Sequence, residues 1–340
     1  MDRLSQCQDS EVRIGPGVGA GATMSTGAWL VPAAHWLAGP GRLVIVLLAL
    51  VVVATALNPR FLSSINLFNV LRQVSVIGII SVGMTYVILA GGGGIDLSVG
   101  SAATLCGTLA AGLQVFNNLP TPLAWAIAIL AGVAVGSGNG FMATRLGFQP
   151  FIATLAMMVA LDGIAMTYSG GAAIPGISRS FQYLGTAYWG PVPFPVIIFL
   201  AFIITGGMVL RYTLFGHYLY ATGSNAAAAW LAGVNISRVR MCCYVFSGVC
   251  SAVGGLMLTS VLAGSVPYLA RGYELDAIAA VTIGGTSLAG GVGGVGGTFL
   301  GVLILGILNN MFNLIGLSAY AQMIAKGIII VVAVASQRRG

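Results

Sequence analysis

Charged side chains are scarce in this sequence. They make up 6% of its 340 residues, whereas roughly 25% is usual in soluble domains. Only seven residues are acidic, and the only lysine is Lys326. Hydrophobic residues account for 58% of the chain, and the mean hydropathy is +0.98. A soluble globular domain of this length is therefore excluded, because it could not cover its surface with so few charges.

The sequence also lacks the common motifs of catalysis and nucleotide binding. It has no GxxxxGK phosphate-binding loop, no HExxH zinc motif and no GxSxG nucleophile motif. Gly291, Gly293 and Gly296 match a dinucleotide-binding fingerprint in spacing, but no strand precedes them, so we reject that interpretation. We expect a protein that is not an enzyme and that binds no cofactor.

Metal-binding and nucleic-acid-binding patterns are missing as well. The two histidines, His35 and His217, lie too far apart to indicate a metal site, and the five cysteines lack the spacing of zinc ligands. Four of these cysteines lie in apolar runs, where they serve as small hydrophobic residues. The net charge of +7 comes from arginines that stand singly or in pairs between apolar runs, as membrane topology signals do. We expect no metal site and no nucleic-acid partner.

Long apolar runs are abundant. They recur in windows of roughly 17–25 residues, the length that a helix needs to cross a bilayer, and they are continuous rather than alternating, which excludes a β-barrel. We predict an all-α polytopic membrane protein with about ten transmembrane helices, over residues 42–57, 74–90, 95–113, 122–143, 149–168, 194–211, 239–263, 273–289, 295–315 and 318–336. The third and eighth segments are interrupted by glycine and carry acids at their starts, so we expect short, broken helices there.

The distribution of arginines predicts the topology. With ten crossings and a cytoplasmic N-terminus, nine arginines lie in cytoplasmic segments and four in outer loops, as the positive-inside rule requires. We therefore expect both termini in the cytoplasm. Residues 1–41 are rich in glycine and small residues, have no cleavable signal layout, and are expected to form a disordered tail in which Met1 and Met24 are both candidate starts. A transmembrane domain over 42–336 and a short C-terminal tail over 337–340 complete the expected organisation.

Short echoes within the sequence predict two internally related halves. "VILAG" (87–91) followed by "IDLS" (95–98) is echoed by "SVLAG" (260–264) followed by "ELDA" (274–277). The pattern Gly-x-x-Asn then follows in both halves, at 136–139 and 306–309. Short glycine matches also arise by chance in a chain with 50 glycines. The shared order, with acids at matching breaks, is nevertheless typical of a transport pathway.

Four acidic residues lie within or beside the apolar runs: Asp96, Asp162, Glu274 and Asp276. A carboxylate at the centre of a membrane costs about 2.5–3.5 kcal/mol on insertion scales, so each should face a cavity, a partner or an interface. Asp96 and the Glu274/Asp276 pair stand at the starts of helical segments, where free N–H groups favour a carboxylate. Two roles stay open for them, as helix caps and as part of a transport pathway.

Two stripes of glycine at intervals of four residues predict close helix packing, because small residues let backbones approach one another in membranes. The stripes are Gly132, Gly136 and Gly140 in the first half, and Gly293, Gly297 and Gly301 in the second.

One cytoplasmic loop, about residues 212–238, is unusual. It is nearly free of charge until Arg238, yet it contains the helix-forming run "NAAAAWLAG". A short helix would begin after Asn225, a candidate N-cap, and stop at Gly233. Such a helix would lie either along the membrane face, anchored by Trp230, or against a partner protein.

Four stretches carry a specific resemblance. They are "GMTYVILAGGGGIDLSVGS", "QPFIATLAMM", "GHYLYATGSNAAAAWLAGVNI" and "GYELDAIAAVTIGGTSLAGGVGGVGGTFLGVLILGILNNMFNLIGLSAYAQMIAKG". Over about residues 42–336 the chain closely resembles the ribose-type permease subunits of bacterial ATP-binding-cassette sugar importers. The resemblance implies a ten-helix subunit of the inner membrane that works as a pair, with a copy of itself or with a paralogue, among membrane lipids.

The resemblance also implies partners and sites. A periplasmic sugar-binding protein would deliver a monosaccharide, ribose or a related sugar, and a cytoplasmic ATP-binding-cassette ATPase would drive its passage along the interface of the two permeases. Residues near the pathway or at the helix breaks would be Asp96, Ser98, Asn139, Glu274, Asp276 and Asn309. The loop 212–238 would couple to the ATPase through Gly223, Asn225, Gly233 and Arg238.

The chain departs from the family pattern at three places. The run Gly91–Gly94 is longer than usual, Ala226 stands where a glutamate is normal in the coupling loop, and Asp162 stands where an arginine is frequent. These differences indicate a diverged subunit, or one that pairs with a non-standard partner.

A second function stays open on the sequence alone. In a proton-coupled secondary carrier, the four intramembrane acids would titrate as a relay. The chain lacks the paired Arg or His residues that such relays often have. The sequence does not name the sugar, because specificity in such importers rests largely on the separate binding protein.

Overall fold

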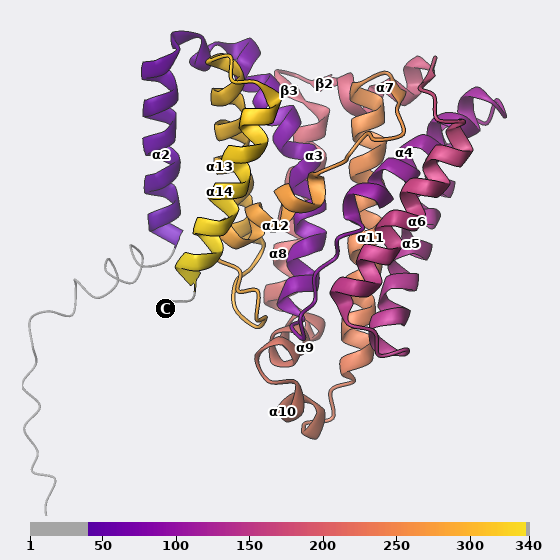
Figure 1. Ribbon diagram of the computed structural model, residues 1–340, viewed down its shortest axis with the longest axis vertical. Coiled ribbons are helices and arrows are strands. Elements are labelled where there is room, and N and C mark those ends of the chain that lie inside the picture. Colours follow the sequence, from indigo (N-terminus) through magenta and orange to yellow (C-terminus); the bar gives the residue numbers. More distant parts are fainter. Residues whose placement is uncertain (1–39, 338–340) are drawn as a thin grey trace, which may run out of the picture.

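A computed structural model describes residues 40–337, most of which are helical (Figure 1). The predicted tail 1–41, apart from its last two residues, and positions 338–340 of the predicted C-terminal tail lie outside the described residues. The elements are α2 (Pro40–Leu57), η1 (Pro59–Leu62), α3 (Ser64–Leu89), α4 (Val99–Val115), α5 (Thr121–Thr144), α6 (Pro150–Ser169), β1 (Ile174–Pro175), α7 (Arg179–Thr186), β2 (Tyr188–Trp189), β3 (Val192–Pro193), α8 (Phe194–Tyr212), α9 (Leu214–Ser224), α10 (Ala226–Leu231), α11 (Ile236–Val261), β4 (Gly264–Ser265), α12 (Tyr273–Ile283), α13 (Val295–Leu314) and α14 (Ala319–Gln337).

Six of the described helices are long and apolar enough to cross a bilayer: α3, α5, α6, α8, α11 and α13. The helices α2 and α4 are shorter apolar helices, and the four strands have two residues each. The fold is thus that of an all-α membrane protein, as predicted, but ten helical spans are not confirmed.

The eighth predicted segment, 273–289, contains a short helix. This helix, α12, has 11 residues, so it is about 16 Å long at about 1.5 Å per residue, roughly half of the ~30 Å hydrocarbon core. The helix ends at Ile283 because Gly284 and Gly285 follow, and Gly285 has a left-handed φ of 86°. The segment is thus broken by glycine, as the sequence indicated, and no single helix crosses the membrane over this range. The third predicted segment is displaced, since α4 begins at Val99 rather than at 95.

Two segments outside the helices, which we call the legs, interrupt the bundle from opposite ends. After α3 the chain continues through residues 90–98 to α4, and after α11 it continues through 262–272 to α12. The first leg starts beside α9, where Gly91 lies against Gly223. The second leg starts beside α7, where Val261 lies against Gly185, and its Ser265 in β4 pairs with Ile174 of β1. The order helix, leg, helix therefore occurs twice with opposite direction, the arrangement of inverted repeats in transporters.

Helix α11 lies at the centre of the bundle and packs closely against α5. A methyl group added at Gly132 would overlap the carbonyl oxygen of Gly248, and one added at Gly136 would overlap that of Tyr244. Gly140 lies equally close to Met241. The first glycine stripe thus brings two backbones into contact, as predicted.

The second glycine stripe brings α13 onto α12. A methyl group at Gly297 would overlap the carbonyl oxygen of Gly284, and one at Gly301 would overlap that of Ala280. Gly293, in the loop before α13, lies against Thr286 in the same way. This stripe holds the short helix α12 in place although α12 cannot cross the membrane alone.

Candidate functional site

Asp96 lies in the first leg, and its side chain is buried among neutral donors. Its Oδ1 accepts hydrogen bonds from the backbone N–H (3.1 Å) and the hydroxyl (2.7 Å) of Ser98. Its Oδ2 accepts a hydrogen bond from the hydroxyl of Ser247 in α11 at 2.8 Å. Asn139 in α5 donates through Nδ2 to Ser98 Oγ at 2.7 Å and to Asp96 Oδ1 at 3.3 Å. The carboxylate therefore ties the leg to α5 and to α11.

Three residues that the sequence predicted, Asp96, Ser98 and Asn139, thus come together. Asp96 is not itself the N-cap of α4, because that position belongs to Ser98; Asp96 instead holds the N–H of Ser98. Ser247 was not predicted. A serine within an apolar run is common in membrane helices, so the sequence carried no specific signal for it.

The second leg ends in a different set of contacts. Glu274 reaches back so that its Oε1 accepts a hydrogen bond from the N–H of Gly272, the N-cap of α12, at 3.2 Å. Its other oxygen lies against Gly100 of α4, where a side chain would overlap it. Asp276, by contrast, does not cap the helix: its Oδ2 pairs with Lys326 Nζ of α14 at 2.8 Å. This is the only ion pair among residues 40–337, and it links α12 to α14.

Asn309 does not join either set. It is half-buried in α13, and its side chain forms no hydrogen bond within the described part of the chain. Its neighbour Asn310 instead exchanges two amide hydrogen bonds, of 2.9 and 2.8 Å, with Asn66 of α3. The contact between α13 and α3 is thus made by Asn310, and the position of Asn309 near a pathway stays a prediction.

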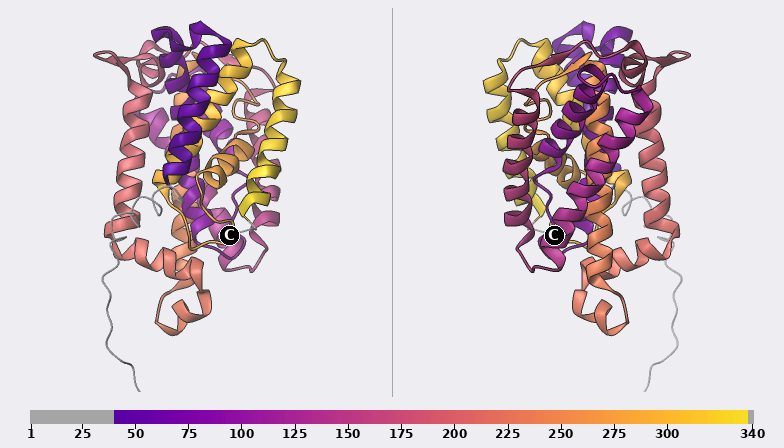
Figure 2. Two further views of the ribbon diagram at one scale, coloured as in Figure 1. Left: turned by 90° about the vertical axis from the view of Figure 1, so that its left-hand side faces the viewer. Right: turned by 90° about the vertical axis from the view of Figure 1, so that its right-hand side faces the viewer.

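The loop 212–238 forms two short helices, α9 and α10, which extend past the other helices at one end of the bundle (Figures 1 and 2). Asn225 caps α10, as predicted, by accepting the N–H of Ala228 at 3.0 Å. Gly233 follows the helix with a left-handed φ of 85°. Trp230 and Leu231 are 68% and 79% exposed, and Arg238 is exposed in the first turn of α11. The outer surface of this protrusion is thus open to a partner.

Gly223, near the end of α9, contacts the end of α3, where the first leg starts, and the loop that follows α12. A methyl group here would overlap the carbonyl oxygen of Leu89, the last residue of α3, and would come within 2.5 Å of the backbone nitrogen of Gly291. That nitrogen donates to the same Leu89 oxygen at 3.0 Å, and Gly290 lies against Gly91. We call this meeting point of residues 89–91, Gly223 and 290–291 the glycine junction. It joins the start of the first leg to the loop that follows α12.

Two side chains reinforce the glycine junction. Tyr220 of α9 donates its hydroxyl to the carbonyl oxygen of Gly293 at 2.8 Å. Arg240 of α11 lies over Gly92 and donates to the carbonyl oxygen of Ala90 at 3.4 Å. A displacement of α9 would therefore act on the first leg and on the loop before α13 together.

The family comparison agrees with the resemblance. The family model described as "Branched-chain amino acid transport system / permease component" matches residues 66–334. The ribose import permease protein RbsC of Haemophilus influenzae is 44% identical over 297 residues, which cover 86% of this chain and 91% of that protein. RbsC of Escherichia coli is 40% identical over 319 residues, covering 93% and 96%. The L-arabinose transport system permease protein AraH of Escherichia coli is 35% identical over 299 residues, covering 86% and 89%. No solved structure matches.

Proposed function

We propose, from the premise that this chain belongs to the ribose-type permeases of ATP-binding-cassette sugar importers, that it carries ribose or a related monosaccharide across the membrane under the drive of a partner ATPase. The family makes it a sugar permease, a non-enzymatic multi-pass component of the inner membrane. Its members work with an ATPase and with a periplasmic binding protein.

The glycine junction is the observation that carries the ATP-driven mechanism. The protrusion α9–α10 supplies an exposed surface at one end of the bundle. Gly223 connects this protrusion to the start of the first leg and to the loop that follows α12. Because the backbones at the junction are in contact, α9 cannot move without displacing the end of α3 or residues 290–291. Closure of an ATPase against α10 would therefore shift the first leg, which holds Asp96, and the loop that follows α12, the helix that carries Glu274. We assign Gly223, Asn225, Gly233 and Arg238 to this coupling.

The contacts of the acids favour this mechanism over a proton relay. Asp96 is held by hydroxyl and backbone donors, and Asp276 is paired with Lys326. Asp96 thus holds the first leg in position, and Asp276 holds α12 against α14. Uncharged polar side chains such as Ser98 and Asn139 are better hydrogen-bonding partners for a neutral sugar than charged groups are. We place the pathway beside the two legs, with Asn309 on its α13 side.

The functional unit that we propose is a pair of permeases, with both termini in the cytoplasm and lipid around the outer helices. The sugar would pass along the interface of the two subunits. In this orientation, α9 and α10 face the ATPase, and the end that carries α7 faces the binding protein.

Reconstitution tests the proposal. The permease, the ATP-binding protein that co-purifies with it and the binding protein are placed in liposomes, and uptake of labelled D-ribose, L-arabinose and D-xylose is measured. We expect uptake of at least one sugar that requires ATP and persists with a protonophore. Uptake that needs no ATPase and collapses with the protonophore would contradict the proposal and support the secondary carrier.

A further inference from the structure

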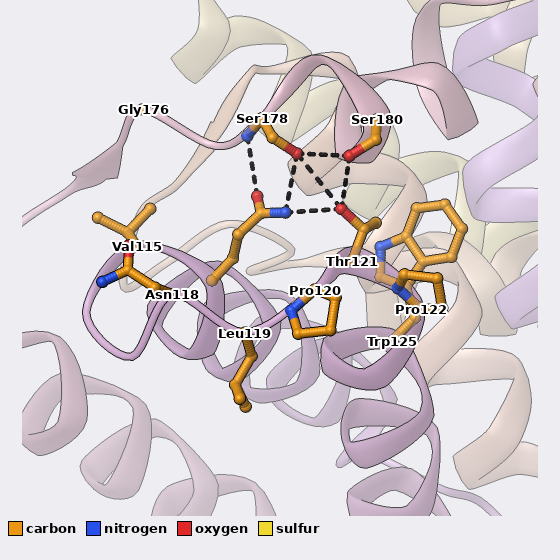
Figure 3. A pocket seen from close by; sticks show the side chains of 11 residues that line it. Val115, Asn118, Leu119, Pro120, Thr121, Pro122, Trp125, Gly176, Ser178 and Ser180 are labelled. Carbon is orange, nitrogen blue, oxygen red and sulfur yellow. Dashed lines mark hydrogen bonds between the residues drawn. The ribbon is translucent and has the colours of Figure 1, made fainter.

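A polar pocket opens at the end of the bundle opposite α10, and none of the predicted site residues lines it. It lies between the end of α4, the start of α5 and the segment before α7, is open to the surface, and has a volume of about 660 Å³ (Figure 3). Ligand pockets usually measure about 300–1,000 Å³. Its lining has no charged side chain, so its chemistry suits a neutral ligand.

A fixed hydrogen-bond cluster forms one wall of this pocket. The amide of Gln114 donates to the hydroxyls of Thr121 (2.7 Å) and Ser178 (2.8 Å) and accepts the N–H of Ser178 (2.8 Å). Ser180 lies 2.7 Å from both hydroxyl oxygens. The cluster joins α4, α5 and α7, so the wall is preorganised.

One hydroxyl proton of this cluster has no acceptor within the cluster. Ser178 Oγ accepts from Gln114 and from the N–H of Phe181, so both of its lone pairs are used. The three hydroxyl protons must then share the remaining lone pairs of Thr121 and Ser180. Every arrangement leaves one proton without an acceptor in the cluster. Since Thr121 is buried and Ser180 is exposed, the free donor is the hydroxyl of Ser180.

Two further polar groups of the lining are unused. Asn118 has a left-handed φ of 53°, is exposed, and its amide forms no hydrogen bond within residues 40–337. The indole N–H of Trp125 is buried without a partner in the same range. The indole ring and the rings of Pro120 and Pro122 give the pocket apolar walls (Figure 3).

We infer that this pocket is a receiving subsite for the monosaccharide, which occupies it before entering the pathway. A sugar has hydroxyl groups at its edge and C–H groups on its faces. The amide of Asn118 and the hydroxyl of Ser180 match the edge, and the ring walls match the faces. The inference rests on the proposed function and adds to it a site on the permease itself.

The affinity of such a site should be low. A monosaccharide has few atoms, and an open pocket captures little of its surface, so we expect a Kd on the order of millimolar. Weak binding suits a transit site, because a sugar that bound tightly there would not move on.

Binding to the isolated permease tests this inference. The full chain is placed in lipid nanodiscs, without a sugar-headed detergent, and D-ribose is titrated while saturation-transfer NMR records contact with the protein. We expect a saturable signal. The double variant Asn118→Gly/Ser180→Ala removes both free groups, and glycine retains the left-handed backbone. It should weaken binding by about tenfold, since each hydrogen bond contributes modestly.

Thr186→Ala is the matched control, because it removes an exposed hydroxyl of α7 outside the pocket and should leave the ribose Kd unchanged. Absence of a saturable signal, or an unchanged Kd in the double variant, would overturn the inference. So would a double variant that weakens capture of the purified binding protein while ribose gives no signal, since the pocket would then dock protein. ATP-driven uptake in liposomes is measured in a separate experiment. A result that refutes the subsite therefore leaves the proposed transport function untouched.

Discussion

Asp96 shows how a buried carboxylate is held in this membrane protein without an ion pair. Three hydrogen bonds from Ser98 and Ser247, and a longer one from Asn139, surround it. Charge-assisted hydrogen bonds are stronger than neutral ones, and a donor left unpaired in the interior costs about 1–3 kcal/mol. The residue thus stabilises the first leg by satisfying donors from two helices.

Substitution of Asp96 separates this role from a role in proton transfer. Asp96→Asn keeps an acceptor for Ser98 and can donate to Ser247, so we expect uptake near the unchanged level. Asp96→Ala leaves several donors unpaired and should lower the apparent melting temperature by several degrees. Sugar uptake and thermal stability in the same membranes check both. Loss of uptake in Asp96→Asn, with normal expression and stability, would contradict the positioning role.

The ion pair between Asp276 and Lys326 permits a second test at this scale. Removing one partner leaves an uncompensated charge, which costs about 3–5 kcal/mol in a fully buried pair. The two side chains here are 12% and 28% exposed, so we expect a smaller loss. Lys326→Met alone should therefore be less stable than Lys326→Met with Asp276→Asn. Thermal stability of the two single variants and the double variant measures this, and additive effects would show that the pair does not link α12 to α14.

Among single residues, the sequence predicted those whose chemistry is unusual for a membrane span. Asp96 and Asn139 stand out in an apolar run, and they do meet. Ser247 could not be predicted, because the sequence gives no sign of which serine on α11 faces the leg. The contact of Asn310 with Asn66 could not be predicted either, because the sequence does not give the rotation of α13 against α3.

At the scale of elements, glycine determines how closely the helices approach. The contact of α5 with α11 depends on Gly136, where a Cβ would meet the backbone of Tyr244 and Val245. Overpacking costs about 1–3 kcal/mol where side chains can move aside, and here the obstacle is backbone.

We expect Gly136→Ala to destabilise the bundle, because α5 and α11 would have to separate. Gly163→Ala is the matched control: this glycine is also helical, in α6, and has nothing within 4 Å of an added Cβ. Yield of folded protein and apparent melting temperature compare the two. Equal stability of the two variants would show that the α5–α11 contact is less tight than the geometry indicates.

The extent of each element was harder to predict than its existence. The apolar runs predicted the position of most helices, because a helix that crosses the bilayer needs an apolar segment as long as the hydrocarbon core is thick. At 273–289 the glycines indicated a break, and Gly284 and Gly285 do end α12 at Ile283. Hydropathy averaged over a window does not show where a helix ends, because the conformation of single residues decides it.

At the scale of the whole molecule, the two legs enter from opposite ends, and α9 contacts the start of the first leg and the loop that follows α12. This arrangement is suited to alternating access, in which parts of a transporter rock about a fixed site. The echoes in the sequence predicted the order of the features, but not that the two units of helix, leg and helix run in opposite directions. Nor could the sequence place Gly223, Gly91 and Gly290 together, since these residues are far apart along the chain.

Gly223→Ala is the most direct test of coupling through the glycine junction. In liposomes that contain the permease, its ATPase and the binding protein, ATP hydrolysis and D-ribose uptake are measured together, with Gly163→Ala as control. We expect Gly223→Ala to assemble and to hydrolyse ATP but to import at least about tenfold less sugar per ATP, because an added methyl group displaces the backbones that α9 must move. Unchanged uptake per ATP in Gly223→Ala would show that the junction plays no part in transmitting the movement of the ATPase.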